Sequence, residues 1–155
     1  GIRFSTELSF AEDYEMFCRV LEQCGRIVCG TKTKYYYMQR KSGVCNCGYD
    51  RTYQKAMMMF EDYCRIYSRR YPQYKKLFEN HYLFDLMGMA AAMSRNGNYV
   101  AADCRKIKKY VRQKLPQYLM DKKVSLHLKG SACMISVSVR AFGAVYRLLH
   151  GVESE

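Results

Sequence analysis

The chain has 155 residues, with 26 Lys or Arg against 14 Asp or Glu and a formal net charge of +12, and 49% of its residues are hydrophobic. This apolar content is too high for a disordered chain, and the nearest approach to a continuous apolar run, Leu86 to Met93, is too short to span a bilayer. We therefore expect one folded, basic domain, or a piece of a longer protein that is entered in mid-sequence at Gly1.

The first third of the chain predicts a short α/β start. Its helix has apolar residues at the spacing of an amphipathic helix, and the acids Glu12, Asp13 and Glu15 lie in the first turns, where the helix dipole favours negative charge. Its strands are segments rich in β-branched and aromatic residues, and Gly, Ser and Asn mark a loop. The predicted order is a strand at 2–4, a helix at 10–24, strands at 26–29 and 33–38, and a loop at 40–49.

From Asp50 onward the apolar period is helical. The stripe from Tyr53 to Tyr67 predicts a helix capped by Asp50 and followed by Pro72, and the stripe from Tyr74 to Met93 predicts another that closes at Asn96-Gly97. Three Ser or Asn residues are predicted caps of later helices, and one proline suits the first position of a short helical turn. These are Asn98, Ser125 and Ser138 as caps, and Pro116 before the turn that ends at Met120.

The predicted fold class is therefore mainly α, with a short strand-helix-strand start and a helical bundle. We divide the chain into residues 1–48 and a helical region at 49–155. The 8 cysteines mostly occupy apolar positions of predicted elements, which favours reduced packing residues over a disulfide framework. No metal site is predicted, because only Cys45 and Cys47 approach ligand spacing and the histidines are isolated.

One local constellation could carry chemistry. The sequence has no Gly-rich phosphate loop, no Ser-His-Asp set and no helical pair of metal-binding His. It does have a carboxylate pair, Glu12-Asp13, at a helix start, and a basic loop, Arg40-Lys41, after an aromatic strand. A positioned carboxylate can deprotonate a hydroxyl, and Arg or Lys can hold a phosphate. The alternative is that Glu12 and Asp13 only complement the helix dipole.

The order of these segments resembles the closing part of the catalytic domain of bacterial family 2 glycosyltransferases. The resemblance covers residues 1 to about 45. It lies in Gly1-Ile2-Arg3-Phe4, Phe10-Ala11-Glu12-Asp13-Tyr14-Glu15-Met16-Phe17, Arg26-Ile27-Val28 and Tyr35-Tyr36-Tyr37-Met38-Gln39-Arg40-Lys41-Ser42-Gly43. The last segment has Met38 where the family commonly has Arg, and Ser-Gly in place of Gly-Ser.

The resemblance implies a GT-A type enzyme that transfers a sugar from a nucleotide-sugar donor to a hydroxyl group. The acceptor that carries this hydroxyl is a glycan or a lipid-linked molecule. It implies that Asp13, with Glu12 beside it, is the general base, and that Arg40, with Lys41, lies near the donor diphosphate. A divalent metal, Mg or Mn, is expected in the full-length enzyme but outside these residues. The nucleotide-binding half is missing from them, so the fragment alone is expected to transfer no sugar.

Residues 105–147 carry eleven Lys or Arg and one acid, Asp121. Such a surface is attracted to anionic partners, and we expect a cytoplasmic protein whose basic tail contacts the inner face of the membrane. The transferase interpretation includes no nucleic-acid partner. If the fragment ends within a fold, apolar surface exposed there could be buried in a homodimer of the fragment. The alternative interpretation is a basic helical binding module for nucleic acid or protein partners.

Overall fold

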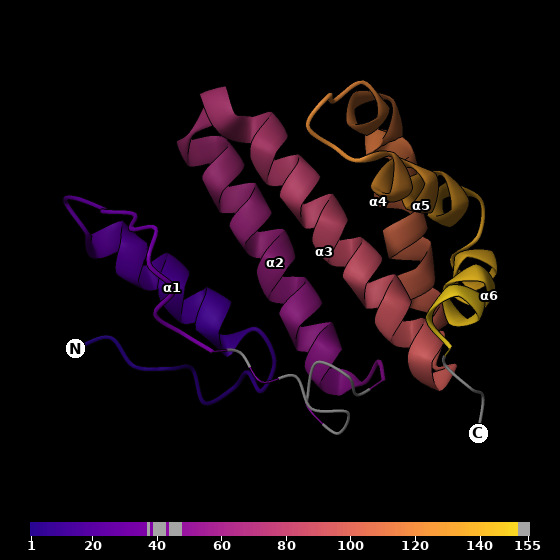
Figure 1. Ribbon diagram of the computed structural model, residues 1–155, viewed down its shortest axis with the longest axis horizontal. Coiled ribbons are helices and arrows are strands. Elements are labelled where there is room, and N and C mark those ends of the chain that lie inside the picture. The colour runs from indigo at the N-terminus through magenta and orange to yellow at the C-terminus, as the bar shows by residue number, and fades with distance from the viewer. Residues whose placement is uncertain (37, 39–42, 44–47, 152–155) are drawn as a thin grey trace. The chain divides into compact units, whose positions relative to one another are not determined.

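The computed structural model describes residues 1–36, 38, 43 and 48–151. The chain divides into two compact units, Gly1–Cys47 and Gly48–Glu155, and each is described by itself. Within the described residues the regular structure is entirely helical, with six α-helices and one 3₁₀ turn (Figure 1). The prediction of a mainly α fold is confirmed.

The first unit contains one helix, α1 (Glu12–Gln23), within the range predicted for it. Its first turn holds the acids Glu12, Asp13 and Glu15, and its one buried residue is Cys18. The segment before it is attached to the helix by Arg19, whose guanidinium donates to the Arg3 carbonyl at 2.5 Å. The helix therefore forms where apolar periodicity and the placement of acids both predict it.

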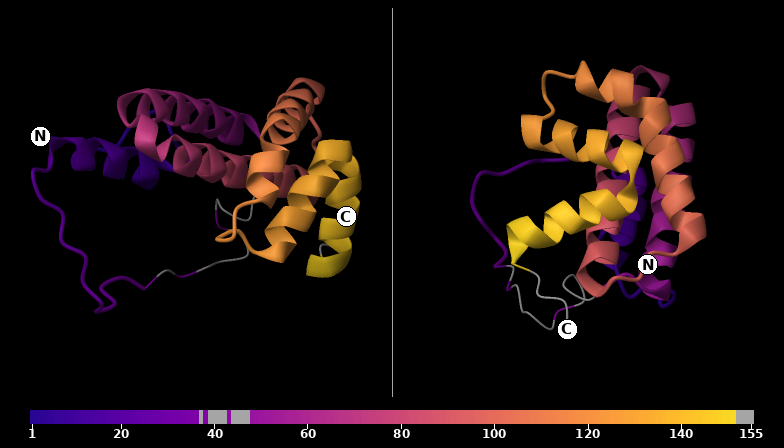
Figure 2. Two further views of the ribbon diagram at one scale, coloured as in Figure 1. Left: turned by 90° about the horizontal axis from the view of Figure 1, so that it is seen from above. Right: turned by 90° about the vertical axis from the view of Figure 1, so that its right-hand side faces the viewer.

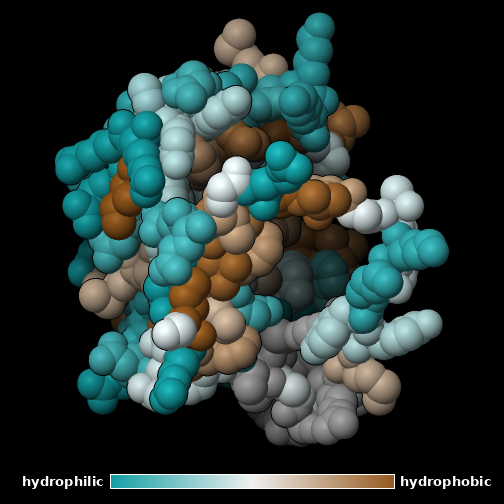
Figure 3. Space-filling model, turned by 90° about the vertical axis from the view of Figure 1, so that its left-hand side faces the viewer, coloured by the Kyte–Doolittle hydropathy of each residue, from teal (hydrophilic) through white to brown (hydrophobic). Residues whose placement is uncertain are grey.

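The predicted strands at 2–4, 26–29 and 33–38 are wrong for the part of these ranges that the structure describes, which is irregular. Several of their apolar side chains are exposed, among them Val28 at 84% and Tyr36 at 89%. A strand needs a neighbour for its N–H and C=O groups, and side-chain propensity alone does not supply one. Figure 3 shows hydrophobic side chains at the surface among hydrophilic ones on one face of the molecule. The predicted loop at 40–49 lies mostly outside the described residues.

The second unit begins with a helical hairpin. Helix α2 (Arg51–Arg70) is followed by the 3₁₀ turn η2 (Pro72–Tyr74) and by α3 (Lys75–Asn96), which returns alongside α2 (Figure 1). Asp50 caps α2 as predicted, because its carboxylate accepts from the amides of Thr52 at 2.9 Å and Tyr53 at 3.1 Å. Gly97 ends α3 in the left-handed region, at φ 68°, as predicted.

Helix α3 is the centre of this unit, since it contacts α2, α4, α5 and α6. Its buried residues surround the helix instead of forming one stripe, and they include Leu83, Leu86, Ala90 and Met93 with no exposed surface. Met57, Met87, Met89 and Met93 are also buried, whereas Met58 is 61% exposed. The core of the unit therefore lies around α3.

Three helices complete the unit: α4 (Ala101–Leu119), α5 (Leu126–Val137) and α6 (Val139–His150). Figure 2 shows α5 and α6 as two short helices joined at an angle. Ser138 caps α6 as predicted, because its hydroxyl accepts from the Ala141 amide at 3.2 Å. Ser125 precedes α5 but makes no cap hydrogen bond with its side chain.

Two predictions for α4 are wrong. The helix does not end before Pro116 but continues to Leu119, because Ile107, Val111 and Tyr118 are buried along one uninterrupted face. The residue at the cap position is Val100, not Asn98. The Asn98 amide instead donates from Nδ2 to the Tyr49 carbonyl at 2.9 Å, so it fixes the chain before α2.

Tyr49 anchors the start of the second unit. Its side chain is fully buried, and its hydroxyl donates to Asp103 on α4 at 3.0 Å. Its backbone pairs with the Asn96 side chain at both the N–H (3.2 Å) and the C=O (3.1 Å). A Cβ on Gly48 would lie 2.0 Å from the Asn96 Cγ, so this close approach requires glycine.

None of the described helices is long and apolar enough to cross a membrane.

Candidate functional site

The predicted catalytic carboxylates lie at the N-terminus of α1. Ala11 precedes the helix in the left-handed region, at φ 60°, and makes no side-chain cap. Asp13 is exposed, and its Oδ1 accepts from the amide of Tyr14 at 2.7 Å. Glu12 is half-buried. The N-terminal end of the helix dipole favours negatively charged side chains at this position.

The third acid of this turn has a different role. Glu15 forms a two-point ion pair with Arg19, one turn later, at 2.6 and 2.8 Å. Within the described residues, no Lys or Arg lies within ion-pair distance of Glu12 or Asp13. Asp13 is therefore the exposed acid of this turn, and a hydroxyl can approach it from solvent.

The predicted diphosphate-binding residues, Arg40 and Lys41, lie outside the described residues. Their role at the donor diphosphate therefore stays a prediction. The described residues contain no group of three or more His, Cys, Asp or Glu that could hold a metal ion. The divalent metal that the resemblance implies is expected outside these residues, so it stays a prediction.

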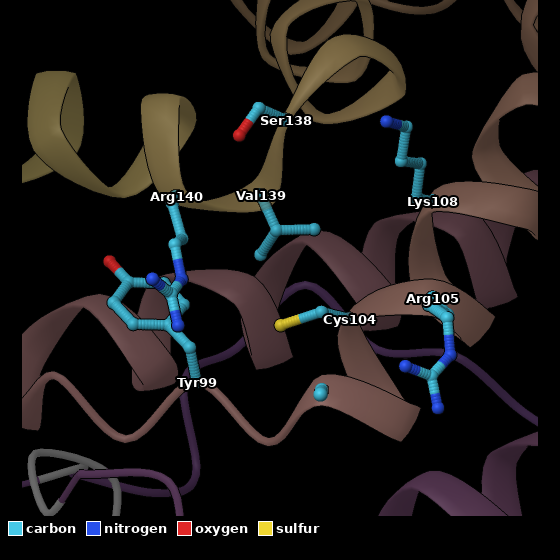
Figure 4. A pocket seen from close by; sticks show the side chains of 8 residues that line it. Tyr99, Cys104, Arg105, Lys108, Ser138, Val139 and Arg140 are labelled. Carbon is cyan, nitrogen blue, oxygen red and sulfur yellow. The ribbon is translucent and has the colours of Figure 1, made fainter.

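A second candidate site is a cationic pocket in the helical unit, of about 270 Å³, between the first half of α4 and the junction of α5 with α6 (Figure 4). Its walls carry three cations and no carboxylate. The lining residues are Tyr99, Ala101, Cys104, Arg105, Lys108, Ser138, Val139 and Arg140. Figure 4 shows Lys108 and Arg140 on opposite sides, with the start of α6 between them, and the Arg105 side chain directed away from Ser138.

The Tyr99 wall of this pocket is held in place by several contacts. The Arg140 guanidinium lies 5.6 Å from the centre of the Tyr99 ring. Arg147 donates to the Tyr99 hydroxyl at 3.2 Å and to the Ser94 carbonyl at 3.2 Å. The hydroxyl fits against α6 only because Gly143 has no side chain, since a Cβ there would lie 2.0 Å from Tyr99 Oη.

The positive charge of the pocket has no internal counter-charge. Burial raises the pKa of the Cys104 thiol, against a smaller opposing effect of Arg140, so the thiol stays protonated. Asp103, the neighbouring acid on α4, accepts from Tyr49 at 3.0 Å and from Gln54 at 2.8 Å. Its carboxylate is therefore committed to α2 and to the segment before it, and it does not line the pocket.

A larger cavity, of about 380 Å³, lies among α2, α3 and α4, and unlike the cationic pocket it has two carboxylates, Glu61 and Glu79, in its lining. Glu79 is 7% exposed and accepts from Lys114 at 2.7 Å and from Gln117 at 3.3 Å. Glu61 pairs with Lys106 at 2.5 Å. These contacts join the three helices, and they explain the cavity as part of the bundle's packing.

One carboxylate outside both sites has a strongly altered acidity. Burial raises the pKa of Asp85 on α3 to about 7. The His81 imidazole lies 3.9 Å from it, and burial lowers the pKa of that imidazole. Neither residue lines the cationic pocket.

The cationic pocket could not be found from the sequence, although the basic run that supplies part of it could. Its residues come from two segments that are far apart in the sequence, 99–108 and 138–140. They become neighbours only when the helices pack. The available signal was Gly143, a glycine in the interior of a predicted helix, which indicates a close approach.

Comparison with known proteins gives no relative: no family model, no curated protein and no solved structure matches this chain.

Proposed function

We propose that residues 1–48 are the terminal part of a family 2, GT-A type glycosyltransferase domain and that Asp13 is its general base. The reaction is transfer of a sugar from a nucleotide-sugar donor to an acceptor hydroxyl, in glycan or cell-surface polysaccharide synthesis. The nucleotide-binding half, with its divalent metal, is supplied by chain outside these 155 residues. The fragment alone transfers no sugar.

The observation that carries the proposal is the state of Asp13. It is exposed in the first turn of a helix that forms at the position of the family's acidic motif, while the neighbouring Glu15 is bound to Arg19. A base must present an ionised carboxylate that a hydroxyl can reach. An acid already tied to a guanidinium has much less freedom to do so, which favours Asp13 over Glu15.

The chemistry assigned to Asp13 is a single proton transfer. A sugar hydroxyl is a weak nucleophile, and its proton passes to a carboxylate oxygen of Asp13 as the oxygen bonds to the donor's anomeric carbon and the bond to the diphosphate breaks. A base of this kind activates the acceptor for one displacement and so for inversion of configuration. Glu12, beside it, adds negative charge that attracts a hydroxyl proton. Arg40 and Lys41 are assigned to the leaving diphosphate.

The exposed apolar residues after α1 also support the proposal. Ile27 is 60% exposed, Val28 84% and Tyr35 76%. Such side chains are typical of strands, and a strand inside a mixed sheet buries them against neighbouring strands and helices. The missing part of a GT-A domain would provide those neighbours.

The test is donor turnover by a chain extended upstream to its natural start, with a panel of nucleotide sugars and a divalent metal. Asp13→Asn is expected to reduce turnover at least a hundredfold with donor binding retained, because a general base contributes 10²–10⁴-fold. Glu22→Gln, an exposed acid at the other end of α1, is the matched control and should retain activity. Equal turnover in Asp13→Asn and the unsubstituted enzyme would remove Asp13 from the mechanism.

The nucleic-acid version of the binding-module alternative needs accessible aromatic faces for base stacking. In the helical unit the side chains of Tyr53, Tyr82 and Tyr118 are buried in the core, whereas Tyr71 and Tyr74 are 37% and 56% exposed. Several of the unit's aromatic rings are therefore unavailable for stacking, so the transferase proposal is preferred. Tight, salt-sensitive oligonucleotide binding, together with no donor turnover by the extended chain, would reverse this preference.

A further inference from the structure

The cationic pocket between α4 and the α5–α6 junction has a property that the proposed transferase reaction does not use: concentrated, uncompensated positive charge around a small hollow. Its volume of about 270 Å³ lies just below the range usual for drug-sized ligands, so it suits a small group or the head of a longer molecule. Its residues belong to the helical unit alone, so inferences about it are independent of Asp13.

The two cations that flank the hollow come from different helices. Lys108 is a half-buried side chain on α4, and Arg140 is an exposed side chain in the first turn of α6. Figure 4 shows Lys108 directed toward the Ser138 side and Arg140 lying over Tyr99. Arg105 at the rim adds a third positive charge. No carboxylate lines the hollow, so an anion entering it meets attraction from several directions.

The start of α6 adds to this field. Ser138 caps the helix by accepting from the Ala141 amide, so that amide is satisfied. The earlier amides, those of Val139 and Arg140, have no acceptor within the helix, as in any first turn. Both residues line the hollow, so the positive end of the helix dipole coincides with the side-chain cations.

The wall that carries Arg140 is fixed before any ligand binds. Tyr99 is packed against Gly143, accepts a hydrogen bond from Arg147 and lies under the Arg140 guanidinium. A guanidinium held on an aromatic ring loses less freedom when it binds than a mobile surface side chain does. This feature distinguishes the pocket from the many solvated lysines of the basic run.

We propose that this pocket binds a phosphate group, as a phosphomonoester or a diphosphate. Phosphate oxygens match both kinds of donor present, because a guanidinium can donate two parallel hydrogen bonds and an ammonium supplies a compact point charge. A soluble phosphate compound and a phosphate-bearing lipid headgroup share this chemistry, and the experiment separates the two sources.

The first arm uses pyrophosphate as the probe, titrated into the 155-residue chain by calorimetry at constant ionic strength. Lys108→Gln and Arg140→Gln are each expected to weaken binding about tenfold, the effect of losing one charge-assisted hydrogen bond. Lys109→Gln is the matched control, because Lys109 is an exposed neighbour on the same helix that does not line the pocket. It should change the affinity less than about twofold.

The second arm measures co-sedimentation with phosphatidylcholine vesicles that contain either phosphatidic acid, a phosphomonoester, or phosphatidylserine, at equal negative charge. A preference for phosphatidic acid that Lys108→Gln removes and Lys109→Gln retains supports the proposal with a lipid headgroup as the source. Pyrophosphate binding with the same variant pattern supports it with a soluble source.

Diffuse surface charge predicts a different pattern. Equal losses in Lys108→Gln and Lys109→Gln in both arms, or no saturable binding of either probe, would overturn the proposal. Far-ultraviolet circular dichroism and urea unfolding of each variant identify a loss that comes from misfolding. Because Asp13 and its helix are untouched by these variants, the result neither supports nor weakens the transferase proposal.

Discussion

Replacing Gly143 by alanine tests the packing that holds the cationic pocket. A Cβ at this position would lie 2.0 Å from Tyr99 Oη and 2.6 Å from Ser94 Oγ, well inside contact distance. Neither neighbour moves freely. The Tyr99 hydroxyl accepts from Arg147, and the fully buried Ser94 donates to the Ala90 carbonyl at 2.8 Å. The added methyl must therefore displace a bonded group.

The magnitude follows from three opposing effects. Alanine in place of glycine within a helix stabilises by about 1 kcal/mol. Overpacking of a filled site costs about 1–3 kcal/mol, and disruption of the hydrogen bond from Arg147 to Tyr99 costs about 1 kcal/mol more. We therefore expect Gly143→Ala to lower the free energy of unfolding by about 1–3 kcal/mol.

Gly130, in α5, provides a matched control, because a Cβ there meets nothing within 4 Å. Gly130→Ala should raise the free energy of unfolding by about 0.5–1 kcal/mol. The assay is urea unfolding followed by circular dichroism at 222 nm. If Gly143→Ala is as stable as Gly130→Ala, the close approach of Tyr99 to α6 is wrong. Tyr99→Phe removes the nearer of the two clashing oxygens, so it should reduce the cost of Gly143→Ala by about 1 kcal/mol.

Two further predictions concern the second unit. Asp50→Ala removes the cap of α2 and should lower the free energy of unfolding by about 1 kcal/mol in urea titrations, whereas Asp62→Ala, which loses an exposed ion pair, should change it by less than about 0.5 kcal/mol. Similar losses in both would argue against the cap. Burial raises the folded-state pKa of Asp85 to about 7, so the folded state binds the extra proton and stability falls as pH rises from about 4 through 7. Asp85→Asn should therefore stabilise the protein by on the order of 1–3 kcal/mol at pH 8 and by much less at pH 5. The variant retains His81, whose depressed pKa has the opposite effect on the pH dependence: it lowers the free energy of unfolding as the pH falls below about 6.5. A stability difference that is constant from pH 5 to pH 8 would refute the assignment.

The helices could be predicted because their signals are local. Asp50, Gly97 and Ser138 act at helix ends through bonds or dihedral angles that involve only a few neighbouring residues. The extension of α4 past Pro116 could not be predicted, since it depends on burial of Tyr118 against other helices. Tertiary burial therefore overrode a local helix-breaking signal.

The predicted strands show the opposite limit. Residues 26–29 and 33–36 have the side chains of strands, but the hydrogen-bonding partner that turns such a segment into a strand is a non-local feature. If the transferase proposal is correct, that partner lies in the rest of the catalytic domain. The same segments should then become strands in the extended enzyme, which amide hydrogen exchange would detect as protection of residues 26–36 relative to the 155-residue chain.

The two candidate sites differ in how much of each the sequence could supply. Asp13, the proposed base, lies at a position set by one helix start, so periodicity and the resemblance were enough to single it out. The pocket depends on cations that neighbour each other only after α5 has reversed the chain toward α4, and on a tyrosine hydroxyl that fits because Gly143 lacks a side chain. A count of basic residues predicts a surface that attracts anions. Tighter binding at one site requires in addition that several hydrogen-bond donors are held in place around that site. The comparison of Lys108→Gln with Lys109→Gln measures that difference directly, because the two variants lose the same charge from adjacent positions of one helix.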